Sequence, residues 1–355
     1  MKKTLFYLSI LVAALALSSC GHGGKKSLFT ATSSGRAYEL LVVIDQGVWE
    51  RPAGRALFDV LDTDVPGLPQ SERSFRIMYT DPSTYDSTLK LIRNIIVVDL
   101  NSSRYTQPKF KSAVNVYAYP QNILTIQAPD EQSFGEYVTE HAQVIIDYFT
   151  RAEINRQIAV LQEKHNDYVQ TKVSSIFDCE VWVPGELSST KQGEDFFWAG
   201  TNAATADQNF VMYAYPYTDK NTFTKEYFVH KRDSVMKVNI PGAGEGMYMM
   251  TDSLMTDVKA ISVQGEYCLE ARGLWRIKGD LMGGPYVSHV RLDRANQRII
   301  VSEIFIYSPD TKKRNLVRQM EASLYTVKLP GSKFVEVSMP DIVITSSNDE
   351  SDPAE

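Results

Sequence analysis

The sequence predicts an α+β protein made of two similar halves, each an antiparallel β-sheet backed by helices. The composition is that of a globular protein, with 355 residues, 43% of them hydrophobic, 23% charged, and a formal net charge of −6,. Short apolar runs typical of strands alternate along the chain with segments of helical periodicity. The order of these elements in the first half recurs in the second half. This recurrence indicates an internal duplication, with chance matching of common elements as the alternative.

The first half contains the clearest strand signals, because its apolar runs are short and bounded by turn residues. Its expected elements, in order, are strand 40–45 (LLVVID), helix 52–62, strand 75–79, helix 84–93, strand 95–100, a hairpin of 113–119 and 122–127, and a long helix 131–173. Pro52 suits the first turn of its helix, and Asp130 is the expected N-cap of the long one,.

The second half repeats this order more loosely. Its expected elements are a strand beginning at Phe210, helix 222–236, strands 286–292 and 298–307, and helix 310–327. Between them, the glycine-rich residues 242–246 (GAGEG) lack the spacing of a phosphate-binding loop and are expected to form a mobile loop,.

The first twenty residues have the form of a bacterial lipoprotein signal. Lys2 and Lys3 precede an apolar run at 5–17, which is too short to span a bilayer with ease and ends in Leu17-Ser18-Ser19-Cys20,. Cleavage before Cys20 makes its thiol the expected site of lipidation, and several acyl chains, palmitate among them, hold a protein stably at a membrane. The alternative is an ordinary secretory signal with an incidental cysteine.

These segments give five expected regions. They are a signal peptide at 1–19, a flexible tether at 20–35, a first α+β unit at 36–173, a second at 174–330, and an acidic disordered tail at 331–355,.

Motifs with a known reaction mechanism are missing from the sequence. It contains no HExxH, CxxC, GxSxG, Walker or Rossmann pattern, and its five histidines are too scattered to predict a metal site,. His289, in a strand beside a glycine-rich segment, is the most interesting of them. The net acidity argues against nucleic acid as a partner.

Two cysteines remain once lipidation uses Cys20. Cys179 and Cys268 both fall in strand-like segments of the second half and would meet an oxidising compartment,. They are either a candidate disulfide or two buried free thiols.

Chemically suggestive residues are densest at 270–291 (EARGLWRIKGDLMGGPYVSHVR). Glycines let backbone approach a ligand closely, and arginine with tryptophan suits a sugar ring or an anionic group. The alternative is a tight strand–loop–strand corner with the tryptophan as core filler. The candidate ligand-binding residues here are Arg272, Trp275, Lys278, Asp280, Gly283 and Gly284.

The last expected helix begins with cations, where the helix dipole is positive and acids are the usual choice. Lys313 and Arg314, together with the free amides of this helix start, are candidates to hold an anion such as a lipid or glycan phosphate,. Solvated surface charges are the alternative.

Several strings resemble a family of Bacteroidetes-type lipoproteins classed as a domain of unknown function. The most specific is RGLWRIKGDLMGGP at 272–285, and SPDTKKRNLVRQMEASLYTV, PGLPQSE and KLIRN agree with it. The resemblance covers about residues 35–329 and implies a lipoprotein of a Gram-negative cell envelope, with no known activity. Since no acidic cluster follows Cys20, we expect the outer membrane and its periplasmic face.

These observations favour a non-catalytic binding or assembly module, with an envelope protein or glycan as partner and no cofactor. The alternative is a hydrolase acting on envelope glycan or peptidoglycan through Asp280 or Asp45 with Arg272,. Convergence of these three residues with Trp275 and Lys278 in one deep pocket would favour the enzyme. A third reading, a subunit of a dimer or complex, would require a contiguous exposed apolar patch.

Overall fold

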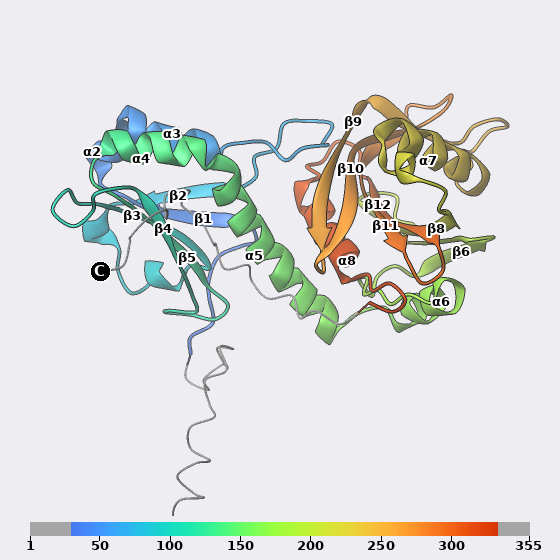
Figure 1. Ribbon diagram of the computed structural model, residues 1–355, viewed down its shortest axis with the longest axis horizontal. Helices are drawn as coiled ribbons and strands as arrows, with labels where there is room; N and C mark the ends of the chain where they lie inside the picture. The colour runs from blue at the N-terminus through green and yellow to red at the C-terminus, as the bar shows by residue number, and fades with distance from the viewer. Residues whose placement is uncertain (1–29, 333–355) are drawn as a thin grey trace, which may run out of the picture.

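The computed structural model describes residues 30–332, which form two α+β domains joined by one long helix (Figure 1). The expected two-part α+β architecture is therefore confirmed. The signal peptide, Cys20, and most of the expected tether and tail lie outside the described residues. Within the described part, no helix is both long enough and apolar enough to cross a membrane.

The first domain contains a sheet in which most pairings are parallel. Its strands, in the spatial order β2-β1-β3-β5-β4, are β1 (Glu39–Val43), β2 (Arg76–Thr80), β3 (Asn94–Leu100), β4 (Lys109–Val114) and β5 (Asn122–Ala128). Strand β1 pairs in parallel with β2 and β3, and β3 with β5, whereas β4 and β5 form the expected antiparallel hairpin. The expectation of an antiparallel sheet is wrong here. Continuous apolar runs such as Leu40–Val43 are buried on both faces, as parallel strands usually are,.

The helices of the first domain cover one face of this sheet (Figure 1). They are α2 (Gln46–Glu50), α3 (Pro52–Leu61), which begins at Pro52 as expected, and α4 (Glu131–Glu140). The helix expected at 84–93 is wrong: two 3₁₀ turns, η1 (Pro82–Thr84) and η2 (Leu89–Leu91), lie there instead. The Asp81 and Asp86 carboxylates accept hydrogen bonds from nearby backbone amides, which favours turns over a continuous helix,.

The expected long helix is three helices. Backbone torsions at His141 interrupt it after α4, α5 spans Ala142–Glu163, and α6 spans Asp167–Phe177. The Asn166 side chain starts α6 by accepting a 3.1 Å hydrogen bond from the Val169 amide,. Because α6 packs into the core of the second domain, the domains divide before it and not at residue 173.

The second domain contains an antiparallel seven-stranded sheet. In spatial order β6-β7-β8-β12-β11-β10-β9, its strands are β6 (Ser189–Gly193), β7 (Phe196–Gly200), β8 (Asp207–Pro216), β9 (Met249–Val263), β10 (Glu266–Ile277), β11 (Gly283–Asp293) and β12 (Arg298–Tyr307). Helices α6 and α8 (Arg314–Thr326) pack on one face, and α7 (Lys225–Asn239), which follows turn η3 (Lys220–Phe223), packs on the other. Strand order and pairing differ between the two sheets, so the halves do not repeat one unit.

Helix α5 belongs to both domains. Its first half packs on the first sheet, whereas Ile154, Ile158 and Leu161 lie in a cluster with Cys268 of β10 and Tyr325 of α8. A second connection is the loop between α3 and β2, which reaches across to the second domain (Figure 1). These two connections join the domains at separate places.

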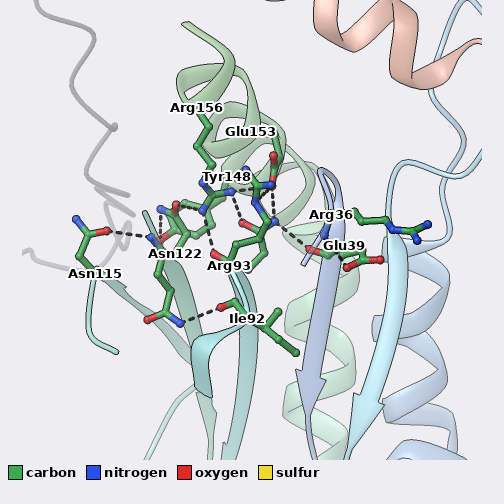
Figure 2. A network of polar contacts seen from close by, with 11 residues as sticks. Arg36, Glu39, Ile92, Arg93, Asn115, Asn122, Tyr148, Glu153 and Arg156 are labelled. Atoms are coloured by element: carbon green, nitrogen blue, oxygen red, sulfur yellow. Dashed lines mark hydrogen bonds and ion pairs between the residues drawn. The ribbon is translucent and has the colours of Figure 1, made fainter. Parts of the chain in front are cut away.

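A polar network fastens α5 to the amino ends of the parallel strands (Figure 2). Glu153 accepts 2.7 Å hydrogen bonds from Asn94 Nδ2 and Arg156 Nη1, and its carboxylate lies 3.2 Å from Arg93 Nε. Arg156 donates further to the Arg93 carbonyl at 2.9 Å and to Asn122 Oδ1 at 2.7 Å. Burial lowers the pKa of Arg156 to about 10. The network ties β3, β5 and α5 together.

The described end of the expected tether is part of the fold. Thr32 pairs with Tyr119 and Ser34 with Ile92, and the Tyr119 amide donates to the Ala31 carbonyl at 2.8 Å. The chain is therefore attached to the first domain from about residue 31, earlier than expected.

Candidate functional site

A cavity of about 640 Å³ lies between the two domains. Helix α5 and the loop between α3 and β2 form its first-domain walls, and strands β9 and β10 with helix α8 form the other side. Its volume is within the range of small-molecule sites, which occur preferentially at domain interfaces. The residues that carry its charge are Asp64, Asp147, Arg151, Lys259, Glu270, Arg272, Arg318 and Glu321.

The floor of the cavity is a buried ionic cluster. Arg272 of β10 donates to both oxygens of Glu270, at 2.7 and 3.0 Å, and pairs with Glu321 of α8. Arg318 donates to Glu321 Oε2 at 3.3 Å, and Lys259 lies 3.4 Å from Glu270. Glu270 and Arg272 share one face of strand β10, and Arg318 and Glu321 share one face of helix α8. The strand and helix periodicities therefore bring each pair to the cavity side of its element,.

Ion pairing overrides burial in setting the charge of the two glutamates. Burial alone raises a carboxyl pKa, but the Arg272 guanidinium holds the pKa of Glu270 well below its usual range,. Burial opposes ionisation of Glu321 in the same way, and Arg272 with Arg318 lowers its pKa. Both carboxylates are therefore ionised at neutral pH.

The wall opposite the floor is one face of α5. Gln143 and Asp147 lie one turn apart and are joined by a 2.8 Å hydrogen bond. Arg151, a further turn along, stacks its guanidinium 4.6 Å from the ring centroid of Tyr325 on α8,. This contact links the two domains across the cavity.

His289 lies behind the floor and is fully buried. It is the cross-strand partner of Glu270, with 3.7 Å between His289 Nε2 and Glu270 Oε2, and it meets the Tyr325 ring edge-on. Neither ring nitrogen has a hydrogen-bond partner among residues 30–332. This carboxylate partner could not be read from the sequence, because the pairing depends on strand register. In the described part of the chain, no three His, Cys, Asp or Glu side chains are grouped to hold a metal ion.

Of the residues predicted in the 270–291 segment, the structure places Arg272 in the cavity and the others elsewhere. Trp275 is a core residue, 2% exposed, whose Nε1 donates to the Ile306 carbonyl at 3.3 Å. Lys278 and Asp280 lie in the exposed β10–β11 turn, where Asp280 accepts a 2.6 Å hydrogen bond from the Leu281 amide. These placements agree with the alternative given for this segment, a tight corner between two strands with Trp275 in the core.

Gly283 and Gly284 begin β11 and have a packing role. A Cβ atom on Gly284 would lie 2.0 Å from the Ile306 carbonyl oxygen, and one on Gly283 would lie 2.7 Å from the Trp275 carbonyl oxygen. The close approach that these glycines permit is therefore to neighbouring strands, not to a ligand.

The residues of the hydrolase alternative do not converge. Asp45 follows β1, caps α2 through the Val48 amide, and borders a separate first-domain cavity of about 430 Å³. Asp280 is in the exposed turn, and Arg272 is in the interdomain cavity.

The basic start of α8 is occupied by an anion from the protein itself. Glu72, in the loop between α3 and β2, accepts hydrogen bonds from the Lys313 amide at 2.6 Å and the Arg314 amide at 3.1 Å. Arg314 Nη1 also donates to the Arg73 carbonyl at 2.7 Å. The amides that were candidates to hold an external anion are thus used by Glu72. Sequence alone does not pair the two segments, because 241 residues separate Glu72 from Lys313.

Of the two alternatives for the remaining cysteines, the structure has the two buried free thiols. Cys179 and Cys268 are free, and they lie in different core clusters. Burial raises the pKa of each thiol to about 12, so both are inert core residues,.

The fold and this cavity define a two-domain α+β protein with a cavity of small-molecule size between its domains. Residues 166–326 match the family model of a domain of unknown function, DUF4837, and residues 33–162 match that of another, DUF8532. The expected likeness to domains of unknown function is thus confirmed, and the two matches meet where α5 gives way to α6.

Curated proteins and solved structures indicate no further family for this chain. No curated protein matches the chain. Among solved structures, a crystal structure from Bacteroides thetaiotaomicron VPI-5482 is 13% identical with a TM-score of 0.23. That match covers 44% of this chain and 47% of the other, so the chain spans less than half the length of that protein.

Proposed function

We propose that this protein is a lipoprotein of a Gram-negative cell envelope that binds a small ligand between its two domains. In this proposal Cys20 carries the lipid, the outer membrane is the site of anchoring, and the domains face the periplasm. The lipobox pattern at residues 17–20 supports the anchor,.

The observation that supports ligand binding is the interdomain cavity. Both domains contribute polar and charged side chains to it, most of which lie on strands and helices,.

The chemistry of the floor favours binding over hydrolysis. A hydrolase of the expected kind needs one carboxyl group that is protonated near neutral pH. Glu270 and Glu321 are both held ionised by Arg272, and their oxygens are occupied by ion pairs. The proposed role is therefore non-catalytic.

Lipid attachment predicts a clear effect of Cys20→Ala. We expect the wild-type protein to incorporate labelled palmitate and to sediment with the outer membrane, and the variant to lose both properties. Cys268→Ala removes a buried thiol and is the control, which should retain both. Equal labelling and sedimentation of Cys20→Ala would disprove the anchor.

Obstructing the cavity tests ligand binding. Gln143→Trp places a large ring on the α5 wall of the cavity, whereas Gln162→Trp makes the same change on the same helix outside the cavity. Native mass spectrometry of protein purified from its own envelope should show a non-covalent adduct on the wild type and Gln162→Trp, and none on Gln143→Trp. An adduct that persists on Gln143→Trp, or its absence from all three proteins, would contradict the proposal.

A further inference from the structure

The carboxylates of the interdomain cavity already have partners. Glu270 and Glu321 share Arg272, and each has a second cation, Lys259 for Glu270 and Arg318 for Glu321. The two acids at the exposed margin accept from neighbouring side chains, Asp147 from Gln143 and Asp64 from Ser71. The two buried glutamates therefore have little capacity left to attract a cation.

Two arginines that line the cavity, in contrast, keep unused donors. Arg318 is 6% exposed and makes its hydrogen bond to Glu321 through Nη1, while its Nε is buried and has no partner among residues 30–332. A buried donor left without a partner costs free energy, so its persistence points to a group that it meets in the functional state.

Arg151 is the second such arginine. Within the described chain, no carboxylate lies within 4 Å of its guanidinium, which instead stacks on Tyr325. Tyr325 lies two helical turns after Arg318 on α8, so the stacking contact brings Arg151 of the first domain to the same helix as Arg318, and both arginines line the cavity,.

From these spare donors we infer that the cavity binds an oxyanion, the carboxylate or phosphate group of a small organic molecule, between Arg151 and Arg318. This inference rests on the proposed binding function and names the class of ligand. Guanidinium groups form paired hydrogen bonds with carboxylate and phosphate oxygens, and they do so best where water is excluded. A ligand held by both arginines bridges α5 and α8, and thus couples ligand binding to the arrangement of the two domains.

The test is an anion titration of the whole protein at constant ionic strength, with inorganic phosphate and citrate as probes and chloride as background. Isothermal titration calorimetry measures the dissociation constants. We expect phosphate, citrate or both to bind the wild type, and Arg151→Gln to weaken that binding at least tenfold. The probe that binds distinguishes a phosphate site from a carboxylate site.

Arg55→Gln is the matched control. Arg55 stacks on Phe58 at 3.9 Å in the first domain, away from the cavity, as Arg151 stacks on Tyr325. It should bind the anions like the wild type. Arg151→Gln breaks no ion pair, so it should disturb the fold less than a substitution of the buried Arg318, which pairs with Glu321.

Two results would overturn the inference: no binding of either anion to the wild type, or equal binding by Arg151→Gln. If Gln143→Trp nonetheless removes the native adduct, the cavity is a site for a ligand without an oxyanion, and the proposed function stands. If the adduct is absent as well, both proposals fail.

Discussion

Arg272→Met is expected to lower the free energy of unfolding of the second domain by about 3–5 kcal/mol. The substitution keeps much of the side-chain volume but removes the cation that Glu270 and Glu321 share. Both glutamates are about 1% exposed, and the pairs left to them, with Lys259 and Arg318, are longer, at 3.4 and 3.3 Å. An uncompensated buried charge is the main cause of the expected loss.

Urea unfolding monitored by hydrogen exchange in β10 and β11 measures this loss domain by domain. Arg276→Met is the control, because Arg276 lies on the same strand but is exposed, and we expect it to change stability by less than about 0.5 kcal/mol,. Similar stability of the two variants would show that the cluster does not hold the floor of the cavity.

The pH dependence gives this prediction a second readout. In the wild type the pKa of Glu270 is below its ordinary value of 4.5, so the stability it contributes is present above that value and is lost as the pH falls,. In Arg272→Met, burial is expected to raise the pKa of both glutamates. The variant then gains relative stability on acidification, and its deficit should be smaller at about pH 5 than at pH 7. A deficit that is constant across this range would indicate lost packing instead.

Local signals in the sequence predicted many of the elements. The runs that became β1 and β3, the first-turn proline of α3 and the hairpin of β4 and β5 all depend on residues close together in the chain. The parallel pairing was missed although Leu40–Val43 is apolar on both faces, a pattern that favours a parallel strand. The breaks between α4, α5 and α6 were missed because the apolar stripe continues across them.

The candidate site was harder to predict, because it depends on contacts between distant segments. Arg272 was singled out for its neighbours in sequence, yet its partner Glu321 is 49 residues away and lies on a helix. Arg151, on the first-domain wall, carried no signal at all, since a lone arginine on a helix is usually a solvated charge. A search for buried charged residues, which needs a structure, identifies the floor of the cavity but not the half-buried Arg151 on its first-domain wall.

Glu153→Ala is expected to destabilise the first domain by about 3–5 kcal/mol, for a related reason at a different place. The Glu153 carboxylate is the shared acceptor of Asn94, Arg93 and Arg156 in the network that fastens α5 to the sheet (Figure 2). Its removal leaves the largely buried Arg156 guanidinium without a counter-charge beside the amino ends of β3 and β5. Exchange of the β3 and β5 amides should accelerate by about 10²–10⁴-fold, with little change in β12 of the second domain.

Glu163→Ala, an exposed position on the same helix, is the control and should leave exchange in β3 and β5 unchanged. Helix α5 also carries Gln143 and Arg151 to the cavity, so loosening its attachment should weaken the binding of phosphate or citrate together with the stability of the first domain. If Glu153→Ala accelerates exchange yet binds these anions like the wild type, then α5 is positioned at the cavity by its packing on the second domain, through Ile154, Ile158 and Leu161, and not by the network. If neither amide exchange nor anion binding changes, then the apolar core alone attaches α5 to the first sheet, and the network adds no measurable stability.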